Sequence, residues 1–352
     1  MLNWPRFGWA WRRILAGGPV SLTARSSDAW TIHPEEEFEV PPAVCLEGAV
    51  ERITSLSPWR NWDAERLLIH GGPTKRSATR AWVLEDVSIV RPVVYGGAAR
   101  SQVGYVPDSW LLPLREDYVD LDRAALVSTW SGSRWFGCYL LDDFPLELLS
   151  PSEAKIALEG NAYRHQLGYR QRLGLVPQPT RIRHGRIKQM VYYEDPGVNT
   201  HKADRFRALR AQLRERMAGE TVAGAGRLIY LKRGRTGDPR MLLNEAEIEC
   251  MLTRFGFEIV EPAGLSVDEI VRRTTDARCV VSVEGSHKSH CIYTLADSGV
   301  LVVLQPPDRF ALPYKDFMDA LGMRCGFLVG VQGEGGFRIL PEELERMLHL
   351  VL

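Results

Sequence analysis

Two stretches of the sequence decide the fold: RLIYLKRG at residues 227–234 and ARCVVSVEGSHK at residues 277–288. In each stretch a run of apolar residues, which includes one serine in the second stretch, ends in charged residues and a glycine. Continuously apolar strands are typical of parallel sheets, because helices cover both of their faces. Both stretches therefore predict buried parallel strands, with polar residues following each carboxyl end.

Helix-like and strand-like segments alternate around these two stretches. Apolar residues recur at helical spacing over residues 244–255, and a strand is expected at residues 258–260. Ser266 and Glu269 form the pattern of a capping box, which predicts the start of another helix. The remaining expected elements are a strand at 300–304, a helix at 315–321, a strand at 327–329 and a final helix at 342–351. This alternation predicts a parallel sheet with right-handed crossovers.

The chain has 352 residues, which exceeds the usual size of one core, so two domains are expected. The triplet Asp195-Pro196-Gly197 breaks the chain, and the helix after it carries one apolar stripe. We place an N-terminal segment at residues 1–25, an α/β domain at 26–205 and the parallel α/β domain at 206–352. The last helix is expected to pack back on the first of these domains.

The first domain contains apolar runs that are stopped by paired glycines, a pattern that indicates strands followed by turns. Such strands are expected at residues 66–70 and at residues 87–95. Further along, Asp142 and Asp143 can open a helix that Pro145 starts, since proline is tolerated in a first helical turn.

The composition narrows the class of protein. Lys+Arg and Asp+Glu both number 44, so the formal net charge is zero, which argues against a general nucleic-acid binder. The six cysteines form no C-x-x-C pair, and we interpret them as reduced thiols of a cytosolic protein. No apolar run reaches the length of a transmembrane helix.

The N-terminal segment combines aromatic and basic residues. It holds Trp4, Trp9 and Trp11 together with Arg12 and Arg13, a combination typical of a membrane interface. A secretory signal is not expected, because the two arginines interrupt the apolar stretch. The alternatives are a disordered start and a segment packed on the body of the protein. The expected location is the cytoplasm, with peripheral contact at the inner face of the plasma membrane as one alternative.

In open α/β sheets, ligands bind beyond the carboxyl ends of the strands. The loop after the first strand of the second domain, residues 232–237, is basic and glycine-rich. The turn after the third strand is Glu284-Gly285-Ser286-His287-Lys288. Its glycine would let a ligand approach the backbone closely. Ser286 could cap a helix, and the free N–H groups at the start of a helix attract an anion. Together these loops predict phosphate binding. A solvated turn and an ordinary helix cap are the plainer alternatives.

Other chemistries fit the sequence less well. The P-loop motif is absent, and the Rossmann glycine fingerprint does not follow the first strand of the second domain. His287, His290 and Cys291 have the spacing of metal ligands on one helix face, but we interpret Cys291 as a core thiol. The segment 120–122 has the D-x-D form that can hold a divalent cation, and we interpret it as solvated surface. No metal or other cofactor is therefore expected.

The order of residues in the second domain resembles the catalytic domain of glycosyltransferase family 61. The shared features, in chain order, are Arg233, Arg240, Asn244-Glu245, the strand from Gly256 to Pro262, the turn from Val281 to Ser286, and Tyr314. Upstream, residues 136–146 resemble another segment of the family, with Asp142 and Pro145 in place. Glu284 and Cys138 stand where that family has histidines.

The resemblance implies a GT-B-like arrangement of two facing Rossmann-like domains, with residues 26–205 on the acceptor side and residues 206–352 binding the nucleotide-sugar donor. It implies inverting transfer of a hexosyl or pentosyl group without an obligatory metal. The expected acceptor is a glycan or a lipid-linked saccharide, in the synthesis of bacterial capsule, lipopolysaccharide or other exopolysaccharide. The alternatives are a non-catalytic module that recognises a nucleotide sugar or glycan, and a sugar-nucleotide epimerase of similar architecture.

Inverting transfer needs a general base for the acceptor hydroxyl and positive charge for the departing diphosphate. The candidate catalytic residues are Asp142, Glu284 and Asp143, and Asp142 is the first choice as the base. The candidate donor-binding residues are Lys232, Arg233, Arg240, Asn244, Glu245, Gly285, Ser286, His287 and Tyr314. The competing interpretations are helix caps at Asp142 and at Glu245.

Overall fold

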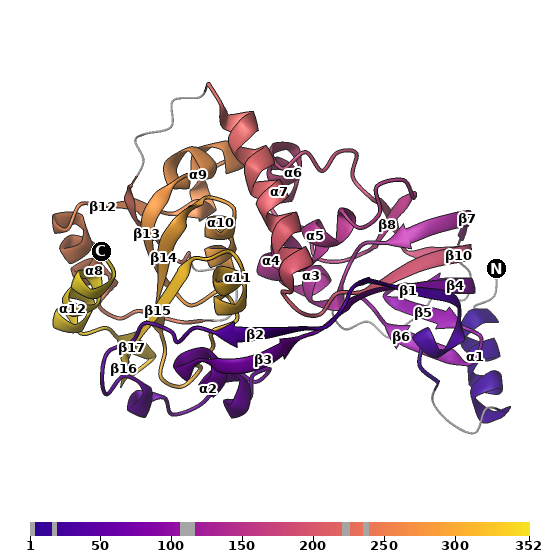
Figure 1. Cartoon of the computed structure of the whole chain (residues 1–352), viewed down its shortest axis with the longest axis horizontal. Helices are drawn as coiled ribbons and strands as arrows, with labels where there is room; N and C mark the ends of the chain where they lie inside the picture. Colours follow the sequence, from indigo (N-terminus) through magenta and orange to yellow (C-terminus); the bar gives the residue numbers. More distant parts are fainter. Residues whose placement is uncertain (1–3, 16–19, 106–116, 220–225, 235–238) are drawn as a thin grey trace. The chain divides into compact units, whose positions relative to one another are not determined.

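The computed structural model describes residues 4–15, 20–105, 117–219, 226–234 and 239–352 (Figure 1). The chain forms two compact units. Unit 1 comprises residues 1–36 and 77–205, and unit 2 comprises residues 37–76 and 206–352. The boundary lies inside the helix α7 (Thr200–Met217), between Arg205 and Phe206.

Unit 2 is built on a five-stranded parallel sheet with the strand order β12-β11-β13-β14-β15. Its strands are β11 (Leu228–Leu231), β12 (Phe257–Val260), β13 (Ala277–Val283), β14 (Leu295–Gln305) and β15 (Arg324–Val329). Its helices include α8 (Glu245–Arg254), α9 (Val267–Thr274), α10 (Ser289–Ile292), α11 (Lys315–Ala320) and α12 (Pro341–Val351). A separate two-stranded pair is formed by β16 (Val331–Gly333) and β17 (Gly336–Arg338). The predicted parallel α/β sheet is confirmed, and Ser266 and Glu269 form the predicted capping box of α9.

Helices α8 and α12 lie side by side and cover one face of this sheet (Figure 1). Leu344, Met347 and Leu348 of α12 are buried in one apolar core with Ile248 and Leu252 of α8. The spacing of these residues forms a single apolar stripe on each helix. The last helix therefore packs in the core of its own unit, where the sequence predicts packing on the first domain.

The sequence predicts residues 37–76 in the first domain, whereas the structure places them in unit 2. The physical reason is backbone pairing along β15: Val44 N donates to Cys325 O at 2.9 Å, and Phe327 N donates to Val44 O at 2.9 Å. This segment contains most of β2 (Glu36–Val40), all of β3 (Gly72–Arg76), which pairs with β2, and the helix α2 (Trp62–His70).

The prediction of a strand at residues 66–70 is wrong, because these residues belong to α2. Asn61 caps this helix, and its side chain accepts a hydrogen bond from Ala64 N at 2.9 Å. The apolar run Leu67–Ile69 is too short for its period to separate a strand from a helix, so the cap decides the outcome.

Unit 1 contains a mixed sheet with the strand order β6-β5-β4-β10-β7-β8-β9, and β1 pairs with β4. Its strands are β1 (Ser26–His33), β4 (Thr79–Val90), β5 (Val93–Gly96), β6 (Ala99–Gln102), β7 (Val119–Leu126), β8 (Lys155–Leu158), β9 (Thr180–Ile182) and β10 (His184–Glu194). Its helices include α1 (Trp4–Leu15), α3 (Trp130–Arg134), α4 (Phe136–Cys138), α5 (Phe144–Glu147) and α6 (Gln166–Arg172). The pairs from β10 through β7 and β8 to β9 are parallel, and the others are antiparallel.

The antiparallel half arises where the sequence predicts one strand at residues 87–95. The chain instead reverses between β4 and β5 at Arg91 and Pro92, and Arg91 adopts a left-handed φ of 55°. Proline has no N–H to donate to a ladder, which favours a break in the strand here. A second reversal at Gly97, with φ 59°, leads into β6. Only the half of this sheet from β10 to β9 therefore has the parallel pairing of a Rossmann-like sheet.

The N-terminal segment contains the helix α1, which packs against β5 and β6 of the sheet in the same unit. The Trp9 ring lies 6.1 Å from the Tyr95 ring, and the Arg100 guanidinium lies 5.4 Å from the Trp9 ring centroid. Trp11 is 67% exposed. The helix thus combines a packed residue with an outward aromatic one. In the described part of the chain, every helix is too short or too polar to span a membrane.

Candidate functional site

The strand order of unit 2 creates a switch point between β11 and β13. The connection from β11 leads to β12 on one side, and the connection from β12 crosses back to β13 on the other side. In such sheets, ligands bind beyond the carboxyl ends of the two strands that flank the switch point. Leu231 of β11 pairs with Ser282 of β13. The two loops that the sequence predicts as phosphate-binding therefore leave the sheet side by side. We call this edge the switch-point site, formed by residues 232–234 and 284–288.

Arg233 crosses the backbone of Gly285 at this edge. Its Nη1 donates to the carbonyl oxygen of Glu284 at 2.7 Å. A Cβ added to Gly285 would lie 1.7 Å from the same nitrogen, and Gly285 has a φ of 154°, which favours glycine. The glycine of this turn thus makes room for a guanidinium group, and the two loops form one structure.

The side chain of Glu284 is buried and surrounded by positive charge. Its Oε1 lies 3.3 Å from Lys288 Nζ, and its Oε2 lies 3.0 Å from Arg240 Nε. Burial raises the pKa of Glu284, but the charges of Lys288, Arg240 and Arg233 outweigh burial, so its pKa lies below the usual value. An ionised, enclosed carboxylate holds neighbouring cations in place more readily than it takes up a proton from a substrate. The geometry favours this anchoring role for Glu284 over that of a general base.

His287 lies beside Arg233, and among the described residues only its Nε2 has a hydrogen-bond partner. Its Nε2 lies 2.7 Å from Ser282 Oγ, which lies 2.7 Å from the carbonyl oxygen of Leu231. A carbonyl only accepts, so the Ser282 hydroxyl donates to Leu231 and receives the Nε2–H of His287. Burial, together with the charges of Arg233 and Lys288, holds the pKa of His287 well below its usual value. The imidazole is therefore neutral, with Nδ1 as a hydrogen-bond acceptor on the side of Gly285.

Lys232, one of the predicted donor-binding residues, is directed toward α8, whose first residue is Glu245, another of them. Lys232 Nζ lies 2.6 Å from Glu249 Oε1 and 3.9 Å from Glu245 Oε2. Glu245 Oε1 accepts a hydrogen bond from the Tyr230 hydroxyl at 3.0 Å. The charge of Lys232 is thus already balanced by two carboxylates, which makes Arg233 the stronger candidate for contact with a phosphate.

Asn244 is nearly enclosed at the start of α8. Its amide nitrogen donates to Glu247 Oε2 at 3.0 Å and to Ile339 O at 2.8 Å, and its amide oxygen accepts from Ile339 N at 3.2 Å. These bonds tie α8 to the segment before α12. The structure does not bring this side chain together with Arg233.

Tyr314 and Ser286 meet at the switch-point site. The Tyr314 hydroxyl donates to the carbonyl oxygen of Ser286 at 3.3 Å, and Lys288 Nζ lies 4.7 Å from the Tyr314 ring centroid. Ser286 does not cap a helix, because Gly285 occupies the cap position and Ser286 begins a short 3₁₀ turn (Ser286–Lys288) before the four-residue α10. Positive side chains, and not a long helix dipole, therefore dominate the electrostatics of this edge.

The metal-binding interpretations of the sequence find no support among the described side chains. Cys291 is buried, and burial raises the pKa of its thiol to about 12, whereas a metal ligand is a thiolate. Asp120 and Asp122 lie in the exposed first half of β7, where they pair with Arg186 at 3.4 Å and Lys188 at 2.6 Å across the sheet. These contacts agree with the interpretations of a core thiol and a solvated surface.

Unit 1 contains a pocket of about 600 Å³ that is lined in part by Asp142. We call it the Asp142 pocket, and its wall includes Thr129, Trp130, Ser131, Asp142, Tyr192 and Lys202. Asp142 lies in a short π-helical segment (Tyr139–Asp143), and such segments occur frequently at functional sites. Its backbone is helical and not at a cap position, so the competing interpretation of Asp142 as a helix cap is wrong.

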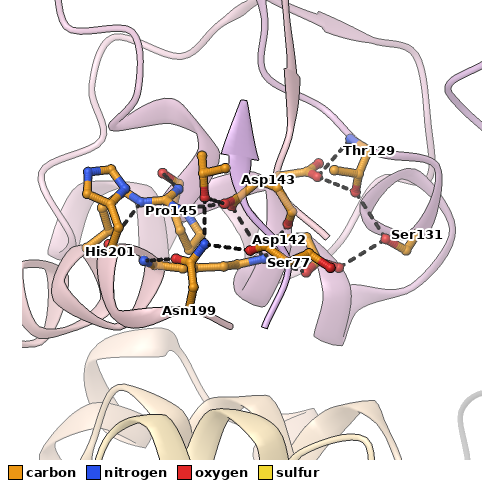
Figure 2. A network of polar contacts seen from close by, with 12 residues as sticks. Ser77, Thr129, Ser131, Asp142, Asp143, Pro145, Asn199 and His201 are labelled. Atoms are coloured by element: carbon orange, nitrogen blue, oxygen red, sulfur yellow. Dashed lines mark hydrogen bonds and ion pairs between the residues drawn. The ribbon is translucent and has the colours of Figure 1, made fainter. Parts of the chain in front are cut away.

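The carboxylates of Asp142 and Asp143 have different partners (Figure 2). Asp142 Oδ2 accepts from Ser131 Oγ at 3.0 Å, its Oδ1 lies 3.3 Å from Lys202 Nζ, and the side chain is 25% exposed. Asp143 is buried, and its Oδ1 accepts from the backbone N–H and the hydroxyl of Thr129 at 2.9 and 2.7 Å. Burial raises the pKa of Asp143 well above its usual value. Asp142 is therefore the carboxylate that a substrate in the pocket can reach, while Asp143 fixes the turn into α3.

Two members of this network have no clear signal in the sequence. Lys202 is almost fully buried and also donates to the backbone oxygen of Asp195 at 3.2 Å. Ser131 belongs to α3, but its glycine- and serine-rich sequence surroundings are typical of an ordinary loop. Cys138, at the position where the resemblance implies a histidine, is poorly suited to act as a base, because burial raises the pKa of its thiol above the ordinary range.

Residues 105–301, more than half of the chain, match the family model described as Glycosyltransferase 61. No curated protein matches the chain. The matched region contains the switch-point site and, from the Asp142 pocket, Ser131, Asp142 and Lys202. Other residues of that pocket's wall, such as Ser77 and Ser101, precede the matched region.

Proposed function

Because the chain belongs to glycosyltransferase family 61, we propose that it is an inverting, metal-independent enzyme that moves a sugar from a nucleotide sugar to a glycan or lipid-linked saccharide. The observation that carries this proposal is the junction of Arg233 and Gly285 at the switch point of the parallel sheet. This position suits the diphosphate of a nucleotide sugar, because preorganised positive charge stabilises a departing phosphate.

In the proposed reaction, the oxygen of an acceptor hydroxyl attacks the anomeric carbon of the donor sugar. The bond from that carbon to the diphosphate oxygen breaks, and its electron pair leaves with the nucleoside diphosphate near Arg233. Asp142 receives the proton of the acceptor hydroxyl. Ser131 and Lys202 support this role, since their contacts with Oδ2 and Oδ1 hold the carboxylate in a fixed orientation. A positioned base contributes ~10²–10⁴-fold in rate.

The other contacts at the switch-point site support roles in donor binding. Glu284 holds Arg240 and Lys288 in place, and the neutral His287 offers Nδ1 to a hydroxyl of the donor. Tyr314 fixes the turn through Ser286. The type of sugar, hexosyl or pentosyl, is part of the proposal that the experiment below decides.

The finer parts of the proposal follow from the family resemblance. They are the GT-B-like arrangement of facing domains, a product in bacterial capsule, lipopolysaccharide or other exopolysaccharide, and a cytoplasmic location. Contact with the inner face of the plasma membrane is supported by Trp11, which is exposed on α1 next to Arg12 and Arg13. Vesicles of anionic lipid that bind the wild type and a Trp11→Ser variant equally would contradict this contact.

The proposal is tested first by a panel of nucleotide sugars and then by product analysis. A donor that binds the folded chain raises its melting temperature, which identifies the nucleotide and the sugar. We expect that donor to release free nucleoside diphosphate when an acceptor is present, and a new glycosidic bond to appear by mass spectrometry. Stabilisation without any release would favour the non-catalytic binding module. An isomerised nucleotide sugar formed without an acceptor would favour the epimerase.

A further inference from the structure

Arg134, at the end of α3, is held between three aromatic rings. Its Cζ lies 4.7 Å from the ring centroid of Tyr105, 5.2 Å from that of Trp130 and 4.6 Å from that of Trp135. The rings also contact one another: Trp130 and Trp135 are 5.4 Å apart, and Tyr105 and Trp130 are 6.0 Å apart. We call these four residues the Arg134 clamp.

The backbone around the clamp is fixed by hydrogen bonds. Ser133 Oγ accepts from Tyr105 N at 2.7 Å and donates to the carbonyl oxygen of Trp130 at 2.8 Å. Asn161 Nδ2 donates to the carbonyl oxygen of Arg134 at 2.9 Å. The three rings and the arginine therefore form a preorganised group and not a chance cluster of mobile side chains.

Aromatic rings occupy the faces of a guanidinium group and leave its N–H groups, at its edge, unsatisfied. Among the residues that the structure describes, no carboxylate forms an ion pair with Arg134, and the side chain is partly exposed. By contrast, Lys202 in the neighbouring pocket is paired with Asp142 and Asp195. The planar fork of an arginine matches the two oxygens of a carboxylate or phosphate.

The clamp adjoins the Asp142 pocket through Trp130, which belongs to both. We propose that Arg134 is an anion-recognition residue for the acceptor, so that the enzyme prefers an acceptor with a carboxylate or phosphate beside the hydroxyl that is glycosylated. This inference rests on the proposed transferase function. The oxyanion has two sources with the same chemistry: a uronic acid within a glycan, or the diphosphate of a lipid-linked saccharide.

The test uses matched acceptor pairs that differ in the anion. Methyl β-glucuronide is compared with methyl β-glucoside, and glucosyl-diphosphoryl-geraniol with geranyl β-glucoside. Binding to the full chain is followed by tryptophan fluorescence, because Trp130 and Trp135 lie in the clamp. Transfer is followed separately with the donor that the thermal panel identifies. We expect the wild type to bind and use at least one anionic member better than its neutral partner, and that pair identifies the source of the anion.

The Arg134→Gln variant removes the charge and keeps much of the side-chain volume. We expect kcat/KM for the preferred anionic acceptor to fall about 10-fold to 100-fold through a higher KM, with neutral acceptors unaffected. Arg134→Lys keeps the cation but loses the fork, so it should recover only part of the preference. Arg100→Gln is the matched control, since Arg100 also lies against a tryptophan ring of unit 1 but outside the clamp.

The outcomes separate this inference from the function on which it rests. Equal loss with charged and neutral acceptors, or a wild type without any anion preference in binding, would overturn the role of Arg134 even if transfer is normal. Selective, Arg134-dependent binding of an anionic probe without any transfer would support the subsite and count against the transferase. A melting temperature close to that of the wild type shows that the Gln variant folds.

Discussion

Replacing Gly285 with alanine tests the junction on which the donor site depends. The new Cβ would lie 1.7 Å from Arg233 Nη1, so the guanidinium must move by at least about 1.7 Å to reach an ordinary van der Waals separation. That movement breaks the 2.7 Å hydrogen bond from Arg233 to Glu284 O. The φ of 154° adds backbone strain of roughly 1–3 kcal/mol, because L side chains rarely adopt it.

The Gly285→Ala enzyme is expected to stay folded and to lose most of its catalysis. A displacement of about 1 Å in a positioning group can cost ~10²-fold in rate, so kcat/KM of Gly285→Ala should fall by about this factor. The assay measures the release of nucleoside diphosphate with the identified donor and acceptor. The free energy of unfolding, measured in urea, should fall by only ~1–3 kcal/mol.

The matched control for this variant is Gly256→Ala. Gly256 also lies in unit 2 and has a φ of 85°, but no atom lies within 4 Å of a Cβ added there. It therefore introduces strain without displacing Arg233. In an Arg233→Ala background, Gly285→Ala should cause little further loss of kcat/KM, because the displaced group is already absent. The reasoning is refuted by a Gly285→Ala enzyme with wild-type kcat/KM, or by an equal loss in Gly256→Ala.

The remaining predictions concern charge at the two sites. Arg233→Ala should lower kcat by about 10²–10³-fold, whereas Arg278→Ala, at the opposite end of the same sheet, should leave steady-state transfer unchanged. Asp142→Asn should keep the donor-induced rise in melting temperature but lose ~10²–10⁴-fold in transfer, and normal transfer would exclude it as the base. Asp143→Ala should instead lower the free energy of unfolding by about 1–3 kcal/mol, because the N–H and hydroxyl of Thr129 lose the carboxylate oxygen to which they donate. An unchanged urea midpoint would contradict this structural role of Asp143. Because the folded protein lowers the pKa of Glu284, this carboxylate adds to the free energy of unfolding at pH values above its unfolded-state pKa, near 4.5. That contribution is lost as the pH falls through the pKa of the folded state. In urea titrations the free energy of unfolding of Glu284→Gln should therefore fall less with acid than that of the wild type, and identical pH profiles would contradict this role.

The parallel sheet of unit 2 could be predicted from the sequence because its strands are apolar and helix signals lie between them. Both RLIYLKRG and ARCVVSVEGSHK carry the strand and the following loop in one local pattern. The helix α2 could not be separated from a strand, since its apolar run is short and its cap is a single asparagine. The place of residues 37–76 depends on the pairing of Val44 with β15, almost 300 residues away, and no local pattern encodes such pairing.

The candidate sites show the same limit at the level of side chains. The sequence predicts that Arg233 and Gly285 lie on neighbouring loops, because adjacent parallel strands end at one edge. It does not predict that Lys232 is balanced by Glu249, or that Lys202 reaches Asp142 from 60 positions along the chain. Those contacts depend on rotamers and on packing between distant elements.

The discontinuous composition of unit 2 has a consequence for how the protein can be divided. Residues 37–76 reach it from the N-terminal side of unit 1, so the chain passes from one unit to the other three times. A protease that cuts once within α7 would leave the first fragment carrying Val44, which pairs with β15 of the second. The two fragments should then copurify as a nicked protein, and residues 206–352 expressed alone would lack part of their own core. A separately folding donor unit would instead need residues 37–76 joined to it by a linker.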